Sequence, residues 1–214
     1  MARGINLKNL LIVEGEDDMH VVEHIWRHHQ HEPKTPLPFY TEQKRGVDTL
    51  LSHIRTHIME PDRENLGILV DADGCTVSRW QAVVGELARA KELQGLSDKL
   101  PETPDESGVI INTKPRIGIW IMPNNHSPGE LEDFIRELIP NEDPIWPRAN
   151  HYINGIPSEE RRFKPQKETK AKIHAWLAAS SRPRLMGAAI GNGELNTEAP
   201  LAQTFYEWLY GLFG

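Results

Sequence analysis

The sequence contains a single cysteine, Cys75, and no long apolar run. One cysteine cannot build an intramolecular disulfide framework and is too few for a thiolate-rich metal site. A membrane-spanning helix would need a run of about 18 apolar residues, which is lacking. Residues 1–10 also lack the apolar run of a secretory signal. From these absences we expect a cytoplasmic protein with no membrane partner.

The sequence also lacks an excess of positive charge, since 24 Lys and Arg face 31 Asp and Glu and the net charge is −7. That balance is unfavourable for binding polyanions by charge alone. The exception is "RRFKPQKETKAK", residues 161–172, which holds six cations and one glutamate. A nucleic acid would need such a local contact, and we expect Arg161, Arg162 and Lys164 to supply it.

Apolar runs and amphipathic stretches alternate along the first 140 residues. We predict strands at residues 9–15, 66–74 and 116–125, and a short strand that ends near residue 43. Helices are predicted at about 18–30, 46–59, 78–93 and 128–139, with a polar loop at 100–108. Such alternation favours an α/β fold with a mostly parallel central sheet flanked by helices.

The composition of the sequence changes after Pro140. Pro, Asn and Trp are frequent up to Pro157, and two helical stretches follow at about 166–180 and 200–213. We find no internal repeat and no low-complexity tract. At 214 residues, one domain or one domain with an appendage is expected. We therefore predict an α/β domain of residues 1–140 and a mainly helical extension, 141–214, packed on it.

Acidic residues follow two of the predicted strands at the point where each strand ends. Glu14 follows the first strand, and Asp71 and Asp73 follow the second long one. In an open parallel sheet, sites form beyond the carboxyl ends of the strands. Carboxylates gathered there would repel each other and hold protons more tightly. A hard divalent cation such as Mg²⁺ takes oxygen ligands and would relieve that repulsion.

Structural roles for the same acids remain open. Asp17 or Asp18 could cap the following helix, and Asp71–Gly74, "DADG", could be an ordinary Asp-Gly turn. Both motifs nevertheless follow buried strands, and together they favour a metal site. Gly15 fits that interpretation, because a residue without a Cβ lets the chain turn sharply beside a ligand.

The two motifs together resemble the Toprim domain. This metal-binding fold is shared by type IA and II topoisomerases, bacterial primases, OLD-family nucleases and the ribonuclease that matures 5S rRNA. The matching residues are Glu14, Gly15 and Asp18 in "LLIVEGEDD", and Asp71 and Asp73 in "LGILVDADG". The resemblance covers about residues 6–140. It implies a Toprim-like, Rossmann-like sheet in which Glu14, Asp71 and Asp73 bind Mg²⁺ or Mn²⁺ and Glu14 also acts in catalysis.

A later stretch, "GIWIMPNNHSPGELEDF", is similar to a little-characterised bacterial and phage group of stand-alone Toprim-like proteins and to the OLD-type branch. That resemblance implies that Glu130 and Glu132 bind a second metal ion, although both would also suit the first turn of a helix. It further implies a catalytic Lys170, which would stabilise charge on a transferring phosphate. Lys167 and Lys172 are alternatives for that role.

Several features of the resembling proteins are missing from this chain. No topoisomerase tyrosine domain is visible, and "GAAIGNG" lacks the Lys-Ser/Thr ending of an ATPase P-loop. Many relatives have Lys or Tyr after Glu-Gly, where this chain has Glu16. OLD-type proteins normally join Toprim to an ATPase, so a separate ATPase partner protein is one expectation.

The predicted function is metal-dependent phosphoryl transfer, by a nuclease that acts on DNA or RNA. The first alternative is a non-catalytic module that binds metal and nucleic acid or regulates a phage-defence system. The second is a primase-like nucleotidyl transferase, for which no zinc-binding or primase helical region is visible.

Histidine and tryptophan offer weaker patterns. His20, His24 and His28 follow one another at every fourth position, about 100° away or more from the apolar side of their helix, which predicts a solvated face. The tryptophans could stack on bases, but their apolar neighbours favour a place in the core: Trp120, Trp146, Trp176 and Trp208.

Overall fold

The computed structural model describes residues 8–31, 36–90, 100–180, 182–183 and 185–214. One five-stranded sheet has the order β2-β1-β3-β5-β4. The strands are β1 (Asn9–Val13), β2 (Tyr40–Gln43), β3 (Asn65–Asp71), β4 (Val109–Ile111) and β5 (Arg116–Met122). All neighbours pair in parallel except β4, which runs antiparallel to β5 at one edge. The predicted α/β fold with a mostly parallel sheet is therefore confirmed.

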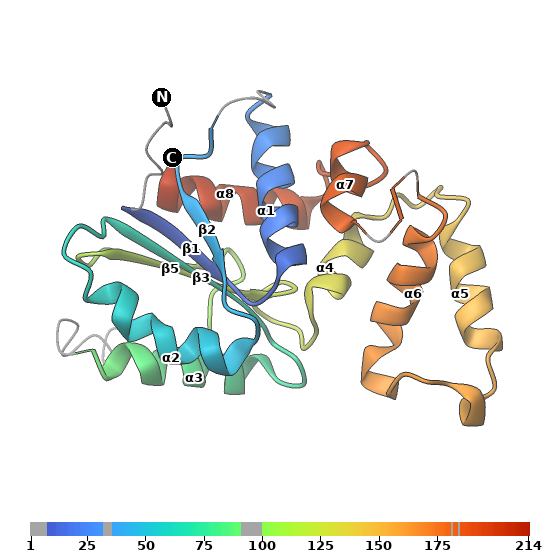
Figure 1. The fold of residues 1–214 in the computed structure, drawn as a ribbon, viewed down its shortest axis with the longest axis horizontal. Coiled ribbons are helices and arrows are strands. Elements are labelled where there is room, and N and C mark those ends of the chain that lie inside the picture. The colour runs from blue at the N-terminus through green and yellow to red at the C-terminus, as the bar shows by residue number, and fades with distance from the viewer. Residues whose placement is uncertain (1–7, 32–35, 91–99, 181, 184) are drawn as a thin grey trace.

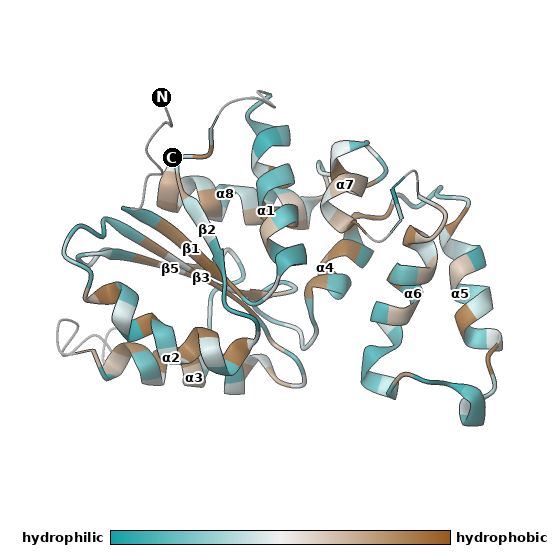
Figure 2. Ribbon diagram, in the orientation of Figure 1, coloured by the Kyte–Doolittle hydropathy of each residue, from teal (hydrophilic) through white to brown (hydrophobic). Residues whose placement is uncertain are grey.

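Helices cover both faces of the sheet (Figure 1). Their bounds are α1 (Glu16–His29), α2 (Val47–Ile58), α3 (Thr76–Ala88), α4 (Leu131–Leu138), α5 (Trp146–Gly155), α6 (Glu168–Leu177), α7 (Met186–Gly191) and α8 (Pro200–Phe213), with 3₁₀ turns η3 (Ser158–Glu160) and η4 (Pro165–Lys167). Helices α2 and α3 bury apolar side chains on one face, and α1 and α8 lie on the other. The central strands β1, β3 and β5 are among the most hydrophobic segments (Figure 2). The central strands β1, β3 and β5 are thus buried on both sides, as continuous apolar runs in parallel sheets require.

Two glycines let α8 approach the sheet closely. Gly67 of β3 and Gly118 of β5 are register partners. A Cβ on Gly118 would lie 2.4 Å from Cδ2 of Leu212, and one on Gly67 would lie 3.0 Å from the Phe213 ring. The last helix of the chain therefore packs directly on the two central strands.

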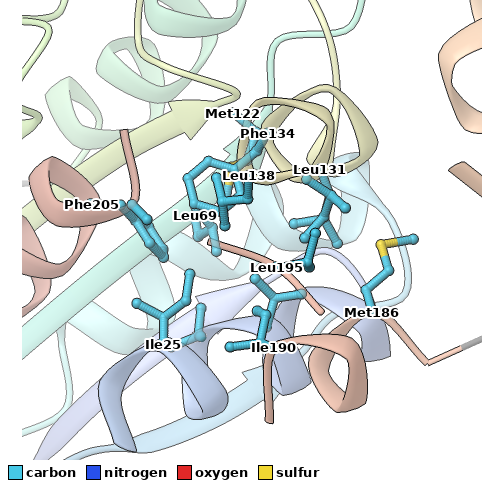
Figure 3. Close-up of a cluster of buried hydrophobic side chains, with 14 of the residues drawn as sticks. Ile25, Leu69, Met122, Leu131, Phe134, Leu138, Met186, Ile190, Leu195 and Phe205 are labelled. Atoms are coloured by element: carbon cyan, nitrogen blue, oxygen red, sulfur yellow. The ribbon is translucent and has the colours of Figure 1, made fainter. Parts of the chain in front are cut away.

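The remaining C-terminal helices extend the same core. Buried side chains of α1, α4, α7 and α8 meet over β3 and β5, as Figure 3 shows for Ile25, Leu69, Phe134, Ile190 and Phe205. Helices α5 and α6 pack against each other beyond α4. The term arm is used below for residues 146–177, which comprise α5, η3, η4 and α6.

Element boundaries differ from prediction in a few places. Helix α1 begins at Glu16, because the Asp18 carboxylate caps the backbone at Gly15. Helix α3 begins at Thr76 and ends at Ala88, while the predicted residues 91–93 lie outside the described part of the chain. Strand β4, helix α5 and helix α7 were not predicted at all.

The histidine row is less solvated than predicted. Burial lowers the pKa of His24, whose ring faces α7: a Cβ on Gly191 would lie 2.8 Å from its Nδ1. The core placement of three tryptophans is confirmed, since Trp120, Trp176 and Trp208 are buried. Trp146 is only partly buried and carries the Arg136 guanidinium 4.8 Å from its ring centre. Among the described helices, none is long and apolar enough to cross a membrane.

Candidate metal centre

The structure brings Glu14 and Asp71 together at the carboxyl edge of the sheet. Their strands, β1 and β3, are neighbours. Oε1 of Glu14 accepts a hydrogen bond of 2.8 Å from the backbone N–H of Asp71. Two acids that are 57 positions apart in the sequence therefore meet because a parallel pairing aligns the ends of their strands.

A third segment joins them at the start of α4. Asp73 and Gly129 exchange two backbone hydrogen bonds of 2.8 Å, and the N–H of Leu131 donates to Oδ1 of Asp71 at 3.1 Å. Gly129 has φ +144°, and a Cβ there would lie 2.6 Å from Oδ2 of Asp133, so this tight link requires glycine. The link places the buried Glu130 and Glu132 beside the two strand ends.

Asp18 takes the capping role that its position allowed. Its Oδ2 accepts the backbone N–H of Gly15 at 2.8 Å, and the side chain is buried. Asp133 does the same for Glu130 at the start of α4, again at 2.8 Å. Two helix N-termini that point toward the same edge are thus fixed by carboxylates, which stabilise their unsatisfied N–H groups.

Three cations face these acids. Arg79 donates from Nη2 to Oδ2 of Asp73 at 2.8 Å and from Nε to the carbonyl of Asp71 at 2.7 Å. Lys170 lies 2.6 Å from Oε1 of Glu132 and 3.8 Å from Oε2 of Glu130. Lys167 hydrogen-bonds Glu130 and lies 3.6 Å from Oδ1 of Asp73.

The structure separates the three candidate lysines. Lys170 and Lys167 both reach the acids, whereas Lys172 pairs with Glu168 on its own helix at 2.5 Å. Sequence reasoning missed Arg79. Its signal would have been a cation eight positions after Asp71, early in the helix that follows the second acidic motif.

The predicted nucleic-acid contacts lie on the arm, beside the lysines that reach the acids. Arg161 donates to the carbonyl of Ile156 at 3.1 Å and to Glu168 at 3.3 Å, and its guanidinium lies 5.8 Å from the Phe163 ring centre. Arg162 and Lys164 are exposed. None of these three side chains makes a described contact with the carboxylates of the sheet edge.

Protons are held tightly at this edge. Burial raises the pKa of Glu14, although the hydrogen bond from Asp71 and the charge of Arg79 oppose the shift. Burial, together with the charge of nearby Glu14, raises the pKa of Asp18 to about 7. Burial and the charges of Asp18 and Glu14 raise the pKa of Asp71 to about 9. The three cations therefore leave part of the negative charge uncompensated.

The chemistry of these side chains fits a hard divalent cation. All candidate ligands are carboxylate oxygens, the donors that Mg²⁺ and Mn²⁺ prefer. Repulsion that raises proton affinity is also relieved when a cation binds. Within the described ranges, no three His, Cys, Asp or Glu side chains already stand close enough to hold an ion. Binding would therefore need carboxylates to turn away from Lys167, Lys170 or Arg79.

The raised pKa of Asp71 predicts how the metal-free protein responds to pH. The folded state keeps this proton up to about pH 9, whereas an unfolded chain loses it near pH 3.8. The stability that the retained proton contributes is present below the unfolded pKa and is lost as pH rises through the folded one. We expect Asp71→Asn to flatten that loss, because Asn is always neutral and its oxygen can still accept from Leu131.

At pH 8 in EDTA, the free energy of unfolding of Asp71→Asn should therefore exceed that of the wild type by at least about 1 kcal/mol. The melting temperature should rise by roughly 2–4 °C. The exposed Asp62→Asn is the matched control and should leave the profile unchanged. A marked fall in the melting temperature of Asp71→Asn would instead identify the Asp71 charge as a structural requirement.

Comparison with known proteins identifies a family. The family model described as "Protein of unknown function (DUF3226)" matches residues 8–214. No curated protein and no solved structure matches the chain. Because the match spans the sheet, the acidic edge and the arm together, the chain belongs to the DUF3226 family.

Proposed function

We propose that this chain is a Mg²⁺- or Mn²⁺-dependent phosphoryl-transfer enzyme of Toprim-like type, and specifically a nuclease that acts on DNA or RNA. One observation carries the proposal. Carboxylates from the ends of β1 and β3 and from the start of α4 gather at one edge, and two lysines of the arm face them. Acids for a cation and amines for a phosphate are what this reaction class needs.

Each acidic side chain has a role in this proposal. Asp71 and Asp73 would hold the ion together with Glu14, and Glu130 and Glu132 would hold a second one. A bound ion would polarise the scissile phosphate and lower the pKa of a water molecule. Oε1 of Glu14 accepts from Asp71, so Oε2 is the atom left to carry or take a proton. Its raised pKa suits that exchange, since acid–base groups work best near the ambient pH.

Two lysines of the arm face the carboxylates and complete the proposed site. Lys167 and Lys170 are half-exposed, so their amines remain open to solvent and to a ligand. An ammonium group stabilises the charge that develops on phosphate oxygens during transfer. This extends the role expected of Lys170 to Lys167, which lies equally close to the acids.

The direct test is a cleavage assay with the full chain. Single- and double-stranded DNA and RNA would each be offered with Mg²⁺, with Mn²⁺ and with EDTA. We expect cleavage of at least one substrate with metal and none in EDTA. If no substrate is cut under any condition, including with a candidate ATPase partner added, the catalytic proposal fails and a non-catalytic nucleic-acid-binding module replaces it.

The arm should provide the salt-sensitive part of nucleic-acid binding. Replacing Arg161, Arg162 and Lys164 with Ala removes three cations of the arm. Each lost phosphate contact should reduce the slope of log affinity against log salt by about 0.7–0.9, or roughly 2–3 in total. Binding would be measured by fluorescence anisotropy with Ca²⁺ in place of Mg²⁺.

A matched control removes the same number of charges elsewhere. Arg55 lies in the last turn of α2, Arg89 directly follows α3, and Lys114 shortly precedes β5, so all three lie toward the amino edge of the sheet. Their replacement by Ala changes net charge equally and should leave the slope nearly unchanged. Equal slopes in the two triple variants would show that the arm carries no specific contact.

A further inference from the structure

Lys167 and Lys170 connect two separate parts of the molecule. Both come from the arm, at the end of η4 and in the first turn of α6. Four ion pairs join them to acids of the sheet edge: Lys167 with Asp73 and Glu130, and Lys170 with Glu130 and Glu132. Glu130 receives both amines, so one carboxylate is shared between the two bridges.

The rest of the arm near these lysines has no apolar anchor. Residues 154–172 are all described, and none of them is buried. The next turns of α6 differ, since Ile173, Trp176 and Leu177 are buried in the core, and Trp176 also donates from Nε1 to Asp143 at 3.0 Å. The arm is thus fixed at one end by packing, and its tip, residues 154–172, meets the sheet edge through the lysine bridges.

A divalent cation and these amines need the same oxygens. Lys167 and Lys170 hydrogen-bond or closely approach three carboxylates that the proposed function assigns to metal ions. Glu130 and Glu132 are buried, but both amines are half-exposed, so water and salt screen each ion pair from the lysine side. A doubly charged ion that replaces two such pairs gains more from these carboxylates than each single ammonium does.

We propose that Lys167 and Lys170 latch the tip of the arm onto the carboxylates in the metal-free protein, and that binding of a divalent cation releases the latch. The inference rests on the proposed function, since it takes the first ion to bind at Asp73 and the second at Glu130 and Glu132. Release frees two amines at the moment when the site becomes competent, so they pass from carboxylate to substrate phosphate. Metal binding and nucleic-acid binding are then coupled through the arm.

The test follows the two amines rather than activity. The full chain would be treated with an amine-acetylating reagent in two parallel samples. One sample would contain MgCl₂ and the other NaCl at the same ionic strength. Acetylation would be read residue by residue by fragment-ion mass spectrometry, and Mg²⁺ binding by calorimetry. Lys172 is the internal control, because it makes the same kind of pair with Glu168 but does not face the acids. Mg²⁺ should raise acetylation of Lys167 and Lys170 several-fold and leave Lys172 unchanged.

A variant tests the competition from the other side. Lys167→Met with Lys170→Met removes both competitors, so Mg²⁺ should bind several-fold more tightly, whereas Lys172→Met should leave affinity unchanged. Weaker Mg²⁺ binding in the double variant, or unchanged acetylation while Mg²⁺ binds, would overturn the latch. Absence of Mg²⁺ binding would overturn the metal centre itself, and the latch with it. Release of the latch without any cleavage of nucleic acid would support the latch and contradict only the nuclease.

Discussion

Glu14→Gln is expected to reduce metal-dependent cleavage by about 10²–10⁴-fold, the range that a positioned acid–base group contributes. The change removes the proton-exchanging carboxyl and one unit of charge from the proposed metal centre. It leaves the side-chain oxygen that accepts the backbone N–H of Asp71 at 2.8 Å. The fold should therefore persist while the chemistry is lost.

The matched control for this variant lies two residues away. Glu16→Gln makes the same chemical change in a carboxylate that is 71% exposed and whose described ion pair is a 3.7 Å contact with His20. Glu16→Gln should retain most of the cleavage rate, measured at saturating Mg²⁺, and both variants should melt within a few degrees of the wild type in EDTA. Equal activity of Glu14→Gln and the wild type would remove Glu14 from the reaction and leave it as a backbone anchor.

The sequence predicts only those site residues that directly follow a recognisable strand. Glu14, Asp71 and Asp73 follow apolar runs, and parallel pairing places such residues at one edge. Arg79 escaped attention although its partners Asp71 and Asp73 are only eight and six positions away. Lys167 could be named only as an alternative to Lys170. Lys167 meets Glu130 across 37 positions, and no local pattern encodes which lysine of a basic segment will face the acids.

In the fold, too, local sequence patterns predict some elements and miss those that depend on contacts with distant residues. Strand β4 is only three residues long and follows a polar loop, so its apolar run is too short to predict a strand. Helix α5 contains Asn150 and Gly155, which disfavour a helix, while Pro147 is tolerated in its first turn. Asp143 nevertheless caps its start by accepting the N–H groups of Ile145 and Trp146 at 2.9 and 2.6 Å. Helix α8 was predicted as a helix, but nothing local shows that it covers the central strands.

That placement of α8 leads to the largest expected effect on stability. Phe205 is fully buried, and its ring centre lies 5.0 Å from that of Trp120, 5.3 Å from Phe134 and 5.7 Å from Trp208. These partners come from β5, α4 and α8, so one side chain joins the sheet to helices on both sides of residue 140. We expect Phe205→Ala to lower the free energy of unfolding by about 3–5 kcal/mol, as truncation of a buried aromatic does.

Urea denaturation would measure the loss. Tyr152→Ala is the matched control, because Tyr152 is 65% exposed on the arm and its truncation should cost less than about 0.5 kcal/mol. A loss on that small scale for Phe205→Ala would mean that α8 contributes little, and residues 1–140 would then be able to fold as a unit. A loss near the expected size, in a single cooperative transition, would mean that the sheet needs α8. In that case the acidic edge depends on the C-terminal helix for its rigidity, because β3 and β5 carry the residues under α8, β3 ends in Asp71, and the loops after the two strands hold Asp73 and Gly129.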